Sequence, residues 1–287
     1  MTQITNQAYT HGGKFHADDV FSAALLKILN PDIKITRGFD PPADFNGIVF
    51  DIGLGRFDHH QQDAEVRENG IPYAAFGLLW REFGGTVMRG CCKPEHADKE
   101  AANFDEKFIQ PLDEDDNTGS GNQLATAIGL FNPSWDSDES ADNCFFEAVN
   151  LAMLILNKKF ESVRSVQRAT ALVEKALAES SDAIVVLPRY APWKNVLVKA
   201  EADFVVYPSQ RGGYSAQVVP ADTDKDPDYY FPEEWAGKPE QELRLASGVD
   251  TLSFCHKGRF LISTGTLEDA IAACRIAREK AKAKSGR

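Results

Sequence analysis

Histidine and aspartate side chains gather at four places in the first part of the chain. These are residues 11–19 (HGGKFHADD), Asp51, residues 58–60 (DHH) and residues 113–117 (DEDDN). Imidazole and carboxylate groups without thiolates are typical ligands of Mn²⁺, Mg²⁺, Fe²⁺ or Co²⁺. Two such ions about 4 Å apart can activate a water molecule and stabilise the oxygens of an in-line phosphoryl displacement. The four clusters therefore predict hydrolytic chemistry at a pair of divalent cations.

Each cluster has an ordinary structural explanation when it stands alone. Asp18 is a suitable cap for the helix that begins beside it, and Asp51 is a suitable turn residue after a strand. Residues 113–116 resemble a solvated acidic turn. The adjacent His59 and His60 are harder to explain as a surface accident. Because all four clusters fall where an α/β sheet places its active site, we favour the chemical interpretation of the set.

Short strands and helices alternate through the opening third of the chain. Strands are expected at residues 7–10, 34–36 and 48–50, and helices at residues 20–29, 74–83 and 98–108. The helices are indicated by apolar residues that recur every three or four positions, as at Val20, Phe21 and Ala24. This order predicts a mostly parallel sheet with ligands beyond the carboxyl ends of its strands, where His11 and Asp51 fall.

The later part of the chain has a different pattern. Residues 142–177 are almost continuously helical and are expected to form two helices. Short β-rich segments follow at residues 183–187, 204–207, 214–219 and 252–255, and a final helix is expected at residues 267–281. We therefore predict an α/β protein of two domains, residues 1–180 with the metal-binding clusters and residues 181–287 as a smaller α/β domain.

The composition is that of a compact protein, and 287 residues suffice for two ordinary domains. With 31 basic and 43 acidic residues the formal net charge is −12, so nonspecific electrostatic binding of nucleic acid is not expected. The five cysteines form no C-x-x-C pair, which argues against a disulfide framework or a structural zinc site. Residues 1–7 are polar, and no apolar run approaches a membrane span. These features predict a reduced, cytoplasmic protein without membrane segments.

The triplet at residues 58–60 resembles the signature of the DHH phosphoesterase superfamily, which includes RecJ-type exonucleases and family II inorganic pyrophosphatases. More narrowly, residues 10–19 (THGGKFHADD) are similar to the opening motif of the melanocyte-proliferating-gene exonuclease family. Further matches to that family are residues 49–53 (VFDIG), 57–61 (FDHHQ), 112–117 (LDEDDN), 207–220 and 231–237. The similarity spans nearly the whole chain.

The resemblance implies two α/β domains with a cleft between them, the first holding two divalent metal ions and the second contacting substrate. Mn²⁺ is the expected metal, with Mg²⁺ or Co²⁺ as alternatives. The implied metal ligands are His11, His16, Asp18, Asp51, His59 and either Asp113 or Asp116, and the implied catalytic residues are Asp58 and His60. In this scheme Asp51 bridges the two ions, and His60 faces the substrate phosphate. The chain departs from relatives outside the branch at His16, which stands one residue beyond their aspartate.

The second half offers fewer candidates for substrate contact. Several superfamily members have a Gly-Gly-His-type segment near the C-terminus, and the corresponding residues 260–266 (FLISTGT) lack the histidine. Ser263 and Thr264 remain candidate phosphate contacts through their hydroxyl groups. Arg189, Arg211 and Lys257 are candidate phosphate clamps, although each is equally suited to an ordinary exposed surface.

Three functions are compatible with these features. The first, which the resemblance favours, is a metal-dependent phosphodiesterase that hydrolyses nucleic acid from an end, as a 3′–5′ exonuclease on RNA or single-stranded nucleic acid. The second is a hydrolase of short oligonucleotides, cyclic dinucleotides or pyrophosphate, which the charge of −12 favours because long polyanions are repelled. The third is a non-catalytic metal-binding regulator. RNA or a short nucleic acid is the expected substrate partner. The oligomeric state is left open, with a homo-oligomer as one possibility.

Overall fold

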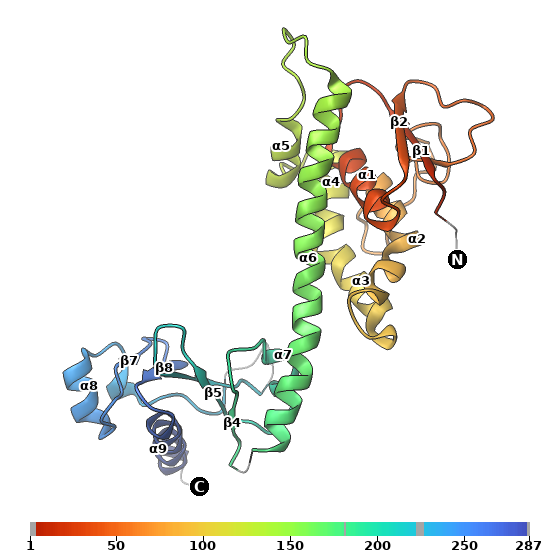
Figure 1. Cartoon of the computed structure of the whole chain (residues 1–287). Coiled ribbons are helices and arrows are strands. Elements are labelled where there is room, and N and C mark those ends of the chain that lie inside the picture. Colours follow the sequence, from red (N-terminus) through yellow and green to blue (C-terminus); the bar gives the residue numbers. More distant parts are fainter. Residues whose placement is uncertain (1–3, 181, 222–226, 286–287) are drawn as a thin grey trace. The chain divides into compact units, whose positions relative to one another are not determined.

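The computed structural model describes residues 4–180, 182–221 and 227–285. The chain divides into two compact units, residues 1–164 and 165–287. The division falls inside one long helix, α6 (Ala141–Ala178), which contributes residues to both units (Figure 1). The boundary expected from the sequence, near residue 180, corresponds to the end of this helix.

A three-stranded parallel sheet lies in the first unit. Its strands are β1 (Gln7–His11), β2 (Lys34–Gly38) and β3 (Ile48–Val49), in the order β2-β1-β3. Both pairs of neighbours are parallel, which confirms the parallel sheet predicted for this part of the chain. Because parallel strands end at the same edge of a sheet, His11 at the end of β1 and Asp51 just after β3 come to one edge.

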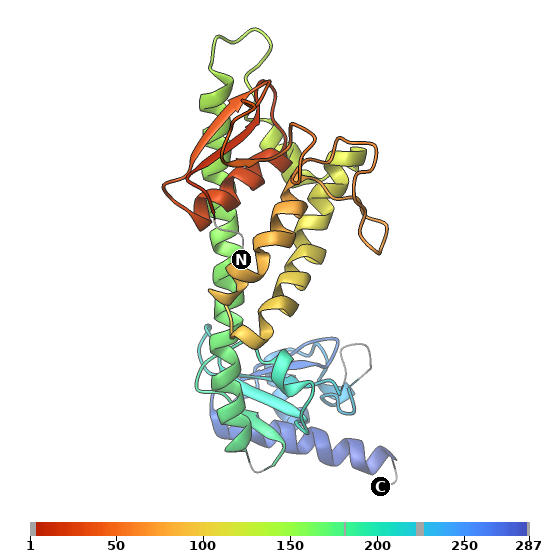
Figure 2. The ribbon, with the colours of Figure 1, turned by 90° about the vertical axis from the view of Figure 1, so that its right-hand side faces the viewer.

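Helices complete the first unit. They are α1 (Ala17–Leu29), α2 (Ala75–Arg89), α3 (Ala97–Phe104), α4 (Gln110–Thr118) and α5 (Gln123–Gly129), with η1 (Pro94–His96) and η2 (Asp105–Ile109). Buried rings join them, since the ring centroid of Phe21 lies 5.5 Å from that of Phe76 and 5.6 Å from that of Phe108. Helices α1 and α2 and segment η2 therefore pack together, and α4 also contacts α1 and α2 (Figures 1 and 2).

Helices α3 and α4 follow one another with only η2 between them. This segment is a π-helix, in which hydrogen bonds span five residues instead of four. Residues 113–117 consequently lie at the end of helix α4, so the alternative explanation of these residues as a solvated acidic turn is wrong. The helix turns neighbouring acidic side chains toward different surroundings.

The single helix α6 replaces the two helices expected over residues 142–177. It runs for 38 residues, and no Gly or Pro occurs in it to interrupt the hydrogen-bond ladder. The expectation of two helices is therefore wrong. Across the described part of the chain, neither α6 nor any other helix has a stretch long and apolar enough to cross a membrane.

The second unit is built on a five-stranded sheet. Its strands follow in the order β4 (Ile184–Val186), β5 (Phe204–Pro208), β6 (Tyr214–Val218), β8 (Leu261–Thr264) and β7 (Phe254–Cys255). Strands β4 and β5 pair in parallel, and the other neighbours are antiparallel. Helix α9 (Leu267–Ser285) packs on β5, β6 and β8 (Figures 1 and 2), and the unit also holds α7 (Lys194–Leu197), α8 (Glu240–Ser247) and η3 (Glu233–Trp235). The α/β class is confirmed, with a second sheet that is mixed.

Candidate metal centre

One group of acidic and imidazole side chains forms at the end of β1. The Nε2 atom of His11 lies 3.1 Å from Oδ2 of Asp19 and 3.2 Å from Oδ2 of Asp51. Its other ring nitrogen, Nδ1, is 3.1 Å from the carbonyl oxygen of Gly12, which orients the ring. A backbone contact of this kind is typical of histidines that bind a metal through the opposite nitrogen.

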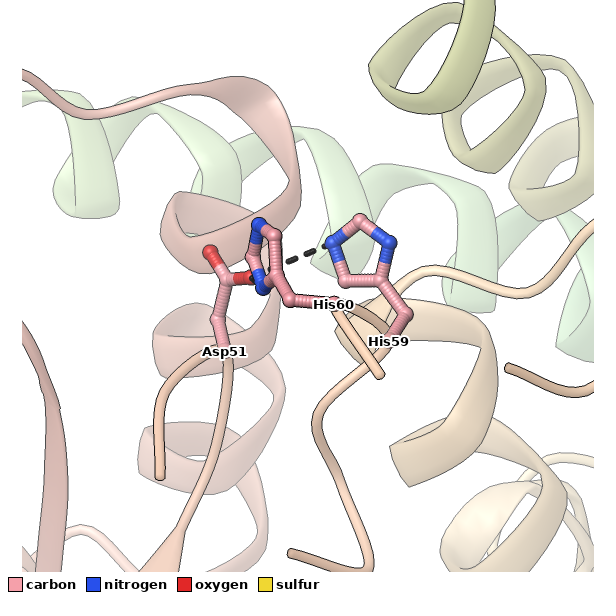
Figure 3. Close-up of side chains that lie close together, drawn as sticks. All are labelled: Asp51, His59 and His60. Atoms are coloured by element: carbon pink, nitrogen blue, oxygen red, sulfur yellow. Dashed lines mark ion pairs between the residues drawn. The ribbon is translucent and has the colours of Figure 1, made fainter. Parts of the chain in front are cut away.

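A second group forms around His59, which follows β3 in the DHH segment. Its Nε2 atom lies 3.2 Å from Oδ1 of Asp51, 3.3 Å from Oδ2 of Asp116 on α4 and 3.9 Å from Oδ2 of Asp18 (Figure 3 shows the contact with Asp51). The Nδ1 atom of His59 faces Oδ1 of Asn117 at 3.3 Å. The imidazole is thus held from behind and directed toward three carboxylates.

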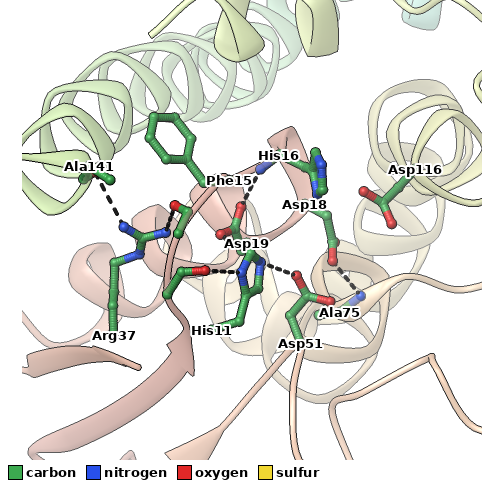
Figure 4. A network of polar contacts seen from close by, with 12 residues as sticks. His11, Phe15, His16, Asp18, Asp19, Arg37, Asp51, Ala75, Asp116 and Ala141 are labelled. Atoms are coloured by element: carbon green, nitrogen blue, oxygen red, sulfur yellow. Dashed lines mark hydrogen bonds and ion pairs between the residues drawn. The ribbon is translucent and has the colours of Figure 1, made fainter. Parts of the chain in front are cut away.

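Asp51 belongs to both groups. One carboxylate oxygen faces His11 (Figure 4) and the other faces His59 (Figure 3), so the residue lies between them. Its backbone has a φ of 56°, in the left-handed region that non-glycine residues seldom adopt. The backbone N–H of Asp51 donates to the carbonyl of Phe57 at 2.9 Å, which fixes the turn after β3. This turn directs both oxygens into the cluster.

Helix α1 supplies two adjacent carboxylates with different roles. Asp18 accepts hydrogen bonds from the backbone N–H groups of Ala75 and Phe76 at the start of α2, at 3.1 and 2.7 Å. Asp19 accepts a hydrogen bond from the N–H of His16 at 2.9 Å and turns its other oxygen to His11. The set of implied ligands did not include Asp19, although its place three residues after His16 is the capping-box spacing that directs a carboxylate back to the helix start.

Among the described residues, Asp19 Oδ2, Asp51 Oδ1 and His59 Nε2 are buried and make no hydrogen bond. Asp51 Oδ1 and His59 Nε2 lie 3.2 Å apart, and Asp19 Oδ2 lies 3.1 Å from His11 Nε2, without hydrogen-bonding geometry, whereas buried polar atoms are normally hydrogen-bonded. Within the described residues, three sets of side chains each bring ligand atoms within 4.8 Å of one another: His11, Asp19 and Asp51; Asp18, His59 and Asp116; and Asp51, His59 and the exposed His60. Four carboxylates thus face two imidazoles, a donor set that fits two divalent cations.

The pKa values of the groups around Asp51 record the same crowding. Burial lowers the pKa of His11, but Asp19 and Asp51 outweigh that effect and raise it from 6.5 to about 10. The pKa of His59 is also raised, because Asp51 and Asp116 outweigh the effect of burial. Burial raises the pKa of Asp51, yet the two imidazoles lower it to about 2. These contacts therefore favour the protonated imidazoles and the ionised Asp51 together.

The remaining carboxylates of the cluster hold protons more tightly than usual. The pKa of Asp18 is raised by burial and then by repulsion from Asp51, and the pKa of Asp116 is raised for the same two reasons. Burial also raises the pKa of Asp19, although His11 opposes it. Both the excess of carboxylates and their burial favour a bound cation at this cluster.

The other members of the predicted site lie around this cluster. Asp58 is buried and accepts hydrogen bonds from the backbone N–H of Leu54 at 2.6 Å and from the Nδ1 of His60 at 2.7 Å. The side chain of His60 is 57% exposed, so its other nitrogen is open to solvent. His16 is exposed, and its ring centroid lies 6.3 Å from that of His11. It belongs to none of the sets of ligand atoms described above.

Asp113 lies in a separate buried cluster with Arg67. Its Oδ2 accepts a hydrogen bond from Nη2 of Arg67 at 2.7 Å, and its Oδ1 accepts one from the N–H of Gly77 at 3.2 Å. Arg67 also makes two hydrogen bonds to Asp105 on η2, at 3.0 and 2.7 Å. A Cβ atom at Gly77 would lie 1.9 Å from Oδ2 of Asp113, so glycine is required there. Of the two alternatives left open by the sequence, the structure brings Asp116 to the metal-type cluster.

Two cavities open beside the cluster within the first unit. The larger, of about 520 Å³, is lined by His59, by residues of α5 and by apolar side chains such as Phe15. The smaller, of about 430 Å³, is lined by His11 and residues 51–54. Lys14, His16, His60 and Asp116 line both cavities, so the two adjoin at the cluster.

The predicted contacts of the second half lie in the second unit. Arg189, Arg211 and Lys257 are all exposed. Thr264 is buried and donates its hydroxyl to the carbonyl of Thr266 at 2.8 Å, so this hydroxyl is already used. Ser263 is half-buried on β8.

The fold and this cluster define an α/β protein with a histidine–aspartate centre suited to divalent cations. The chain matches the family described as "Uncharacterised protein family (UPF0160)", whose profile is named for MYG1 exonucleases, over residues 7–277, and it belongs to that family. It is 30% identical to a MYG1 protein of Chlamydia pneumoniae, over 90% of this chain and 92% of the relative. It is 28% identical to the MYG1 exonuclease of Homo sapiens (93% and 84% covered) and 26% identical to a MYG1 protein of Dictyostelium discoideum (91% and 93%). The family resemblance found in the sequence is confirmed.

Proposed function

We propose that this protein is a metal-dependent phosphodiesterase that hydrolyses nucleic acid from an end, as a 3′–5′ exonuclease on RNA or single-stranded nucleic acid. The observation that carries the proposal is the convergence of four carboxylates and two imidazoles, three of whose buried atoms make no hydrogen bond within the described residues. The name exonuclease, which the human and rat relatives bear, agrees with it.

In this proposal two Mn²⁺ ions are held, one by His11, Asp19 and Asp51 and the other by Asp18, His59 and Asp116, with Asp51 shared between them. When bound, such a pair of ions activates a water molecule and stabilises the oxygens of the phosphoryl group. Mg²⁺ or Co²⁺ are alternatives, because an oxygen-rich set with imidazole suits six-coordinate ions better than tetrahedral zinc.

His60 and Asp58 act on the substrate rather than on the metal. Asp58 holds Nδ1 of His60, which fixes the orientation of the ring. The exposed ring then donates a hydrogen bond to a phosphate oxygen whose charge grows in the transition state. A diester at this position would have room for a substituent in each of the two adjoining cavities.

The wider arrangement is also part of the proposal. It comprises a DHH phosphoesterase-like organisation, with residues 1–180 as the catalytic domain and residues 181–287 as a substrate-binding α/β domain, in a cytoplasmic protein. The exposed side chains of Arg189, Arg211 and Lys257 would contact phosphates, and Ser263 would offer a hydroxyl. His16 would contact substrate or complete a metal site, since it lines both cavities.

Hydrolysis of small phosphate compounds is the second candidate, because the net charge of −12 disfavours long polyanions outside the site. A panel of single-stranded RNA, single-stranded DNA, dinucleotides and pyrophosphate, each with Mn²⁺, separates the two candidates. Stepwise shortening of 5′-labelled RNA supports the exonuclease, whereas turnover of dinucleotides or pyrophosphate alone supports the second. If the protein contains metal but turns over none of these substrates, the remaining candidate is the non-catalytic metal-binding regulator.

A further inference from the structure

One face of the second sheet is covered at strand β6, where Ser215 is buried, and opens toward strands β8 and β7. Residues paired across a sheet share a face, and Phe254 of β7 pairs with Ser263 of β8, which pairs with Ser215 of β6. The residues between them along the strands, such as Ile262, point to the other face and are buried in the core with α9. Ser263 is half-buried and Phe254 is exposed. We name the side of the sheet that carries Phe254 and Ser263 the open face.

Aromatic rings gather at the edge of the open face. Phe254 is 44% exposed and Phe260 is 42% exposed. The ring of His256 lies between them, with its centroid 6.4 Å from that of Phe254 and 4.3 Å from that of Phe260. Nδ1 of His256 accepts a hydrogen bond from the N–H of Gly258 at 2.9 Å, so the ring is held in place with Nε2 as its donor. Exposed rings that adjoin in this way mark a binding surface.

The charges beside these rings are positive. Lys257 and Arg259 stand in the same turn, and neither pairs with a carboxylate within the described residues. The guanidinium of Arg259 lies 5.0 Å from the ring centroid of Tyr230. By contrast, nearby cations are compensated, since Lys238 pairs with Glu242 and Arg244 with Glu240. In a chain of net charge −12, two uncompensated cations beside a row of rings complement an anion that carries flat apolar groups.

We propose that the open face binds the bases of single-stranded nucleic acid, which stack on Phe254, His256 and Phe260 while Lys257 and Arg259 contact the phosphates. Sheets that bind single strands combine exposed aromatic rings with cations in this manner. The Ser263 hydroxyl lies on the same face, where it can contact a base edge. The inference rests on the proposed function in its choice of nucleic acid, yet it concerns binding, which needs no metal.

The test measures binding of a fluorescent single-stranded RNA decamer by fluorescence anisotropy in the presence of chelator. The double variant Phe254→Leu/Phe260→Leu keeps apolar side chains and removes both rings, so its Kd should rise by about 10-fold or more. Phe254→Tyr/Phe260→Tyr should bind like wild type, and Leu245→Ala, which alters an exposed apolar side chain of α8, should change the Kd by less than about twofold. A decamer of abasic sugar phosphates should bind weakly to every variant.

Equal RNA binding by wild type and the double Leu variant overturns the proposal, and so does equal binding of the abasic decamer. If the Leu variant instead changes the oligomeric state in sedimentation without altering RNA binding, the open face is an interface between copies. Hydrolysis of bis(p-nitrophenyl) phosphate with Mn²⁺ is measured in parallel. Because this substrate has no base, its turnover tests the metal centre alone, and the two proposals can fail independently.

Discussion

The start of helix α2 faces two buried carboxylates whose pKa values are both raised by burial but whose charged partners differ. Asp18 accepts hydrogen bonds from the backbone of Ala75 and Phe76, and Asp113 accepts one from the backbone of Gly77. Asp113 is also bonded to Arg67, which opposes the burial that raises the pKa of this carboxyl to about 7. The surroundings of Asp18 are the carboxylates of the candidate metal centre and His59.

The comparison teaches what a helix N-terminus can and cannot do for buried acids. Its N–H groups and dipole favour one negative charge in each position. They do not offset a group of four carboxylates, which needs positive charge from elsewhere. Around Asp113, Arg67 supplies this positive charge. Around Asp18, only imidazoles that can lose their protons supply it, so a cation from solution can replace those protons. The predictions below test this difference.

The largest effect is expected for Asp51→Asn. An amide is nearly isosteric with the carboxylate but cannot neutralise two cations, so hydrolysis should fall below detection while the fold persists. Turnover and bound manganese, measured on the same sample, check the prediction. The matched control is Asp113→Asn, which should keep its metal. Near-normal activity of Asp51→Asn at saturating Mn²⁺ would contradict the two-metal proposal.

Arg67→Met should cause a large loss of stability. Removal of the guanidinium leaves Asp105 and Asp113 without their partner, which costs about 3–5 kcal/mol for a buried pair. Arg81→Met is the control, since Arg81 also lies over the Tyr73 ring but pairs with Glu65 at the surface, and should cost at most about 1 kcal/mol. Urea unfolding with chelator present measures both free energies. Equal losses would show that Arg67 is not the main compensating charge.

The neighbours His59 and His60 should separate metal binding from turnover. His60→Ala should lower kcat by about 10²-fold, the scale for loss of one preorganised donor, with manganese content close to wild type. His59→Ala should lose metal from at least one site, because His59 faces Asp51 and Asp116. Manganese stoichiometry and turnover are measured for both variants. Equal metal loss in the two would refute this division of roles.

A smaller effect is expected from pH. His11 has a pKa of about 10 in the metal-free protein and so carries a proton at pH 7–9. A metal ligand must lose that proton, so the apparent Mn²⁺ affinity should rise with pH, by up to about tenfold per pH unit for each proton released, and level off above pH 10. Calorimetric titration at several pH values and in buffers of different ionisation enthalpy measures the protons. The His11→Asn variant should release at least one proton fewer when it binds Mn²⁺. A Mn²⁺ affinity independent of pH would contradict the assignment of His11 as a metal ligand.

The parts of the fold that depend on local pattern could be predicted from the sequence. Apolar runs that end in polar or glycine residues identify the strands before His11 and Asp51, and the topology of a parallel sheet then brings these two residues together. Helix α6 was less accessible. Polar residues in its middle suggest a break, but without Gly or Pro the helix continues through them.

The rest of the cluster depends on contacts that the local pattern does not contain. Asp113 and Asp116 both lie in one acidic segment, and their different surroundings follow from Arg67, which lies in a loop 46 residues before Asp113. The position of Asp19 could have been predicted from the sequence. Its spacing from His16 indicates a capping carboxylate at the start of α1, and this helix start follows His11 after a short loop.

The π-helical segment η2 has a consequence for how this region tolerates changes in length. A π-helix holds one residue more than the α-helix that would replace it, and one residue corresponds to about 100° of rotation. Deletion of a single residue within Asp105–Ile109 would therefore turn α4 about its own axis and carry Asp113 away from Arg67 and Asp116 away from His59 together. The inserted residue acts like an angular spacer, and homologues that lack it must reach the same two contacts from other positions on the helix.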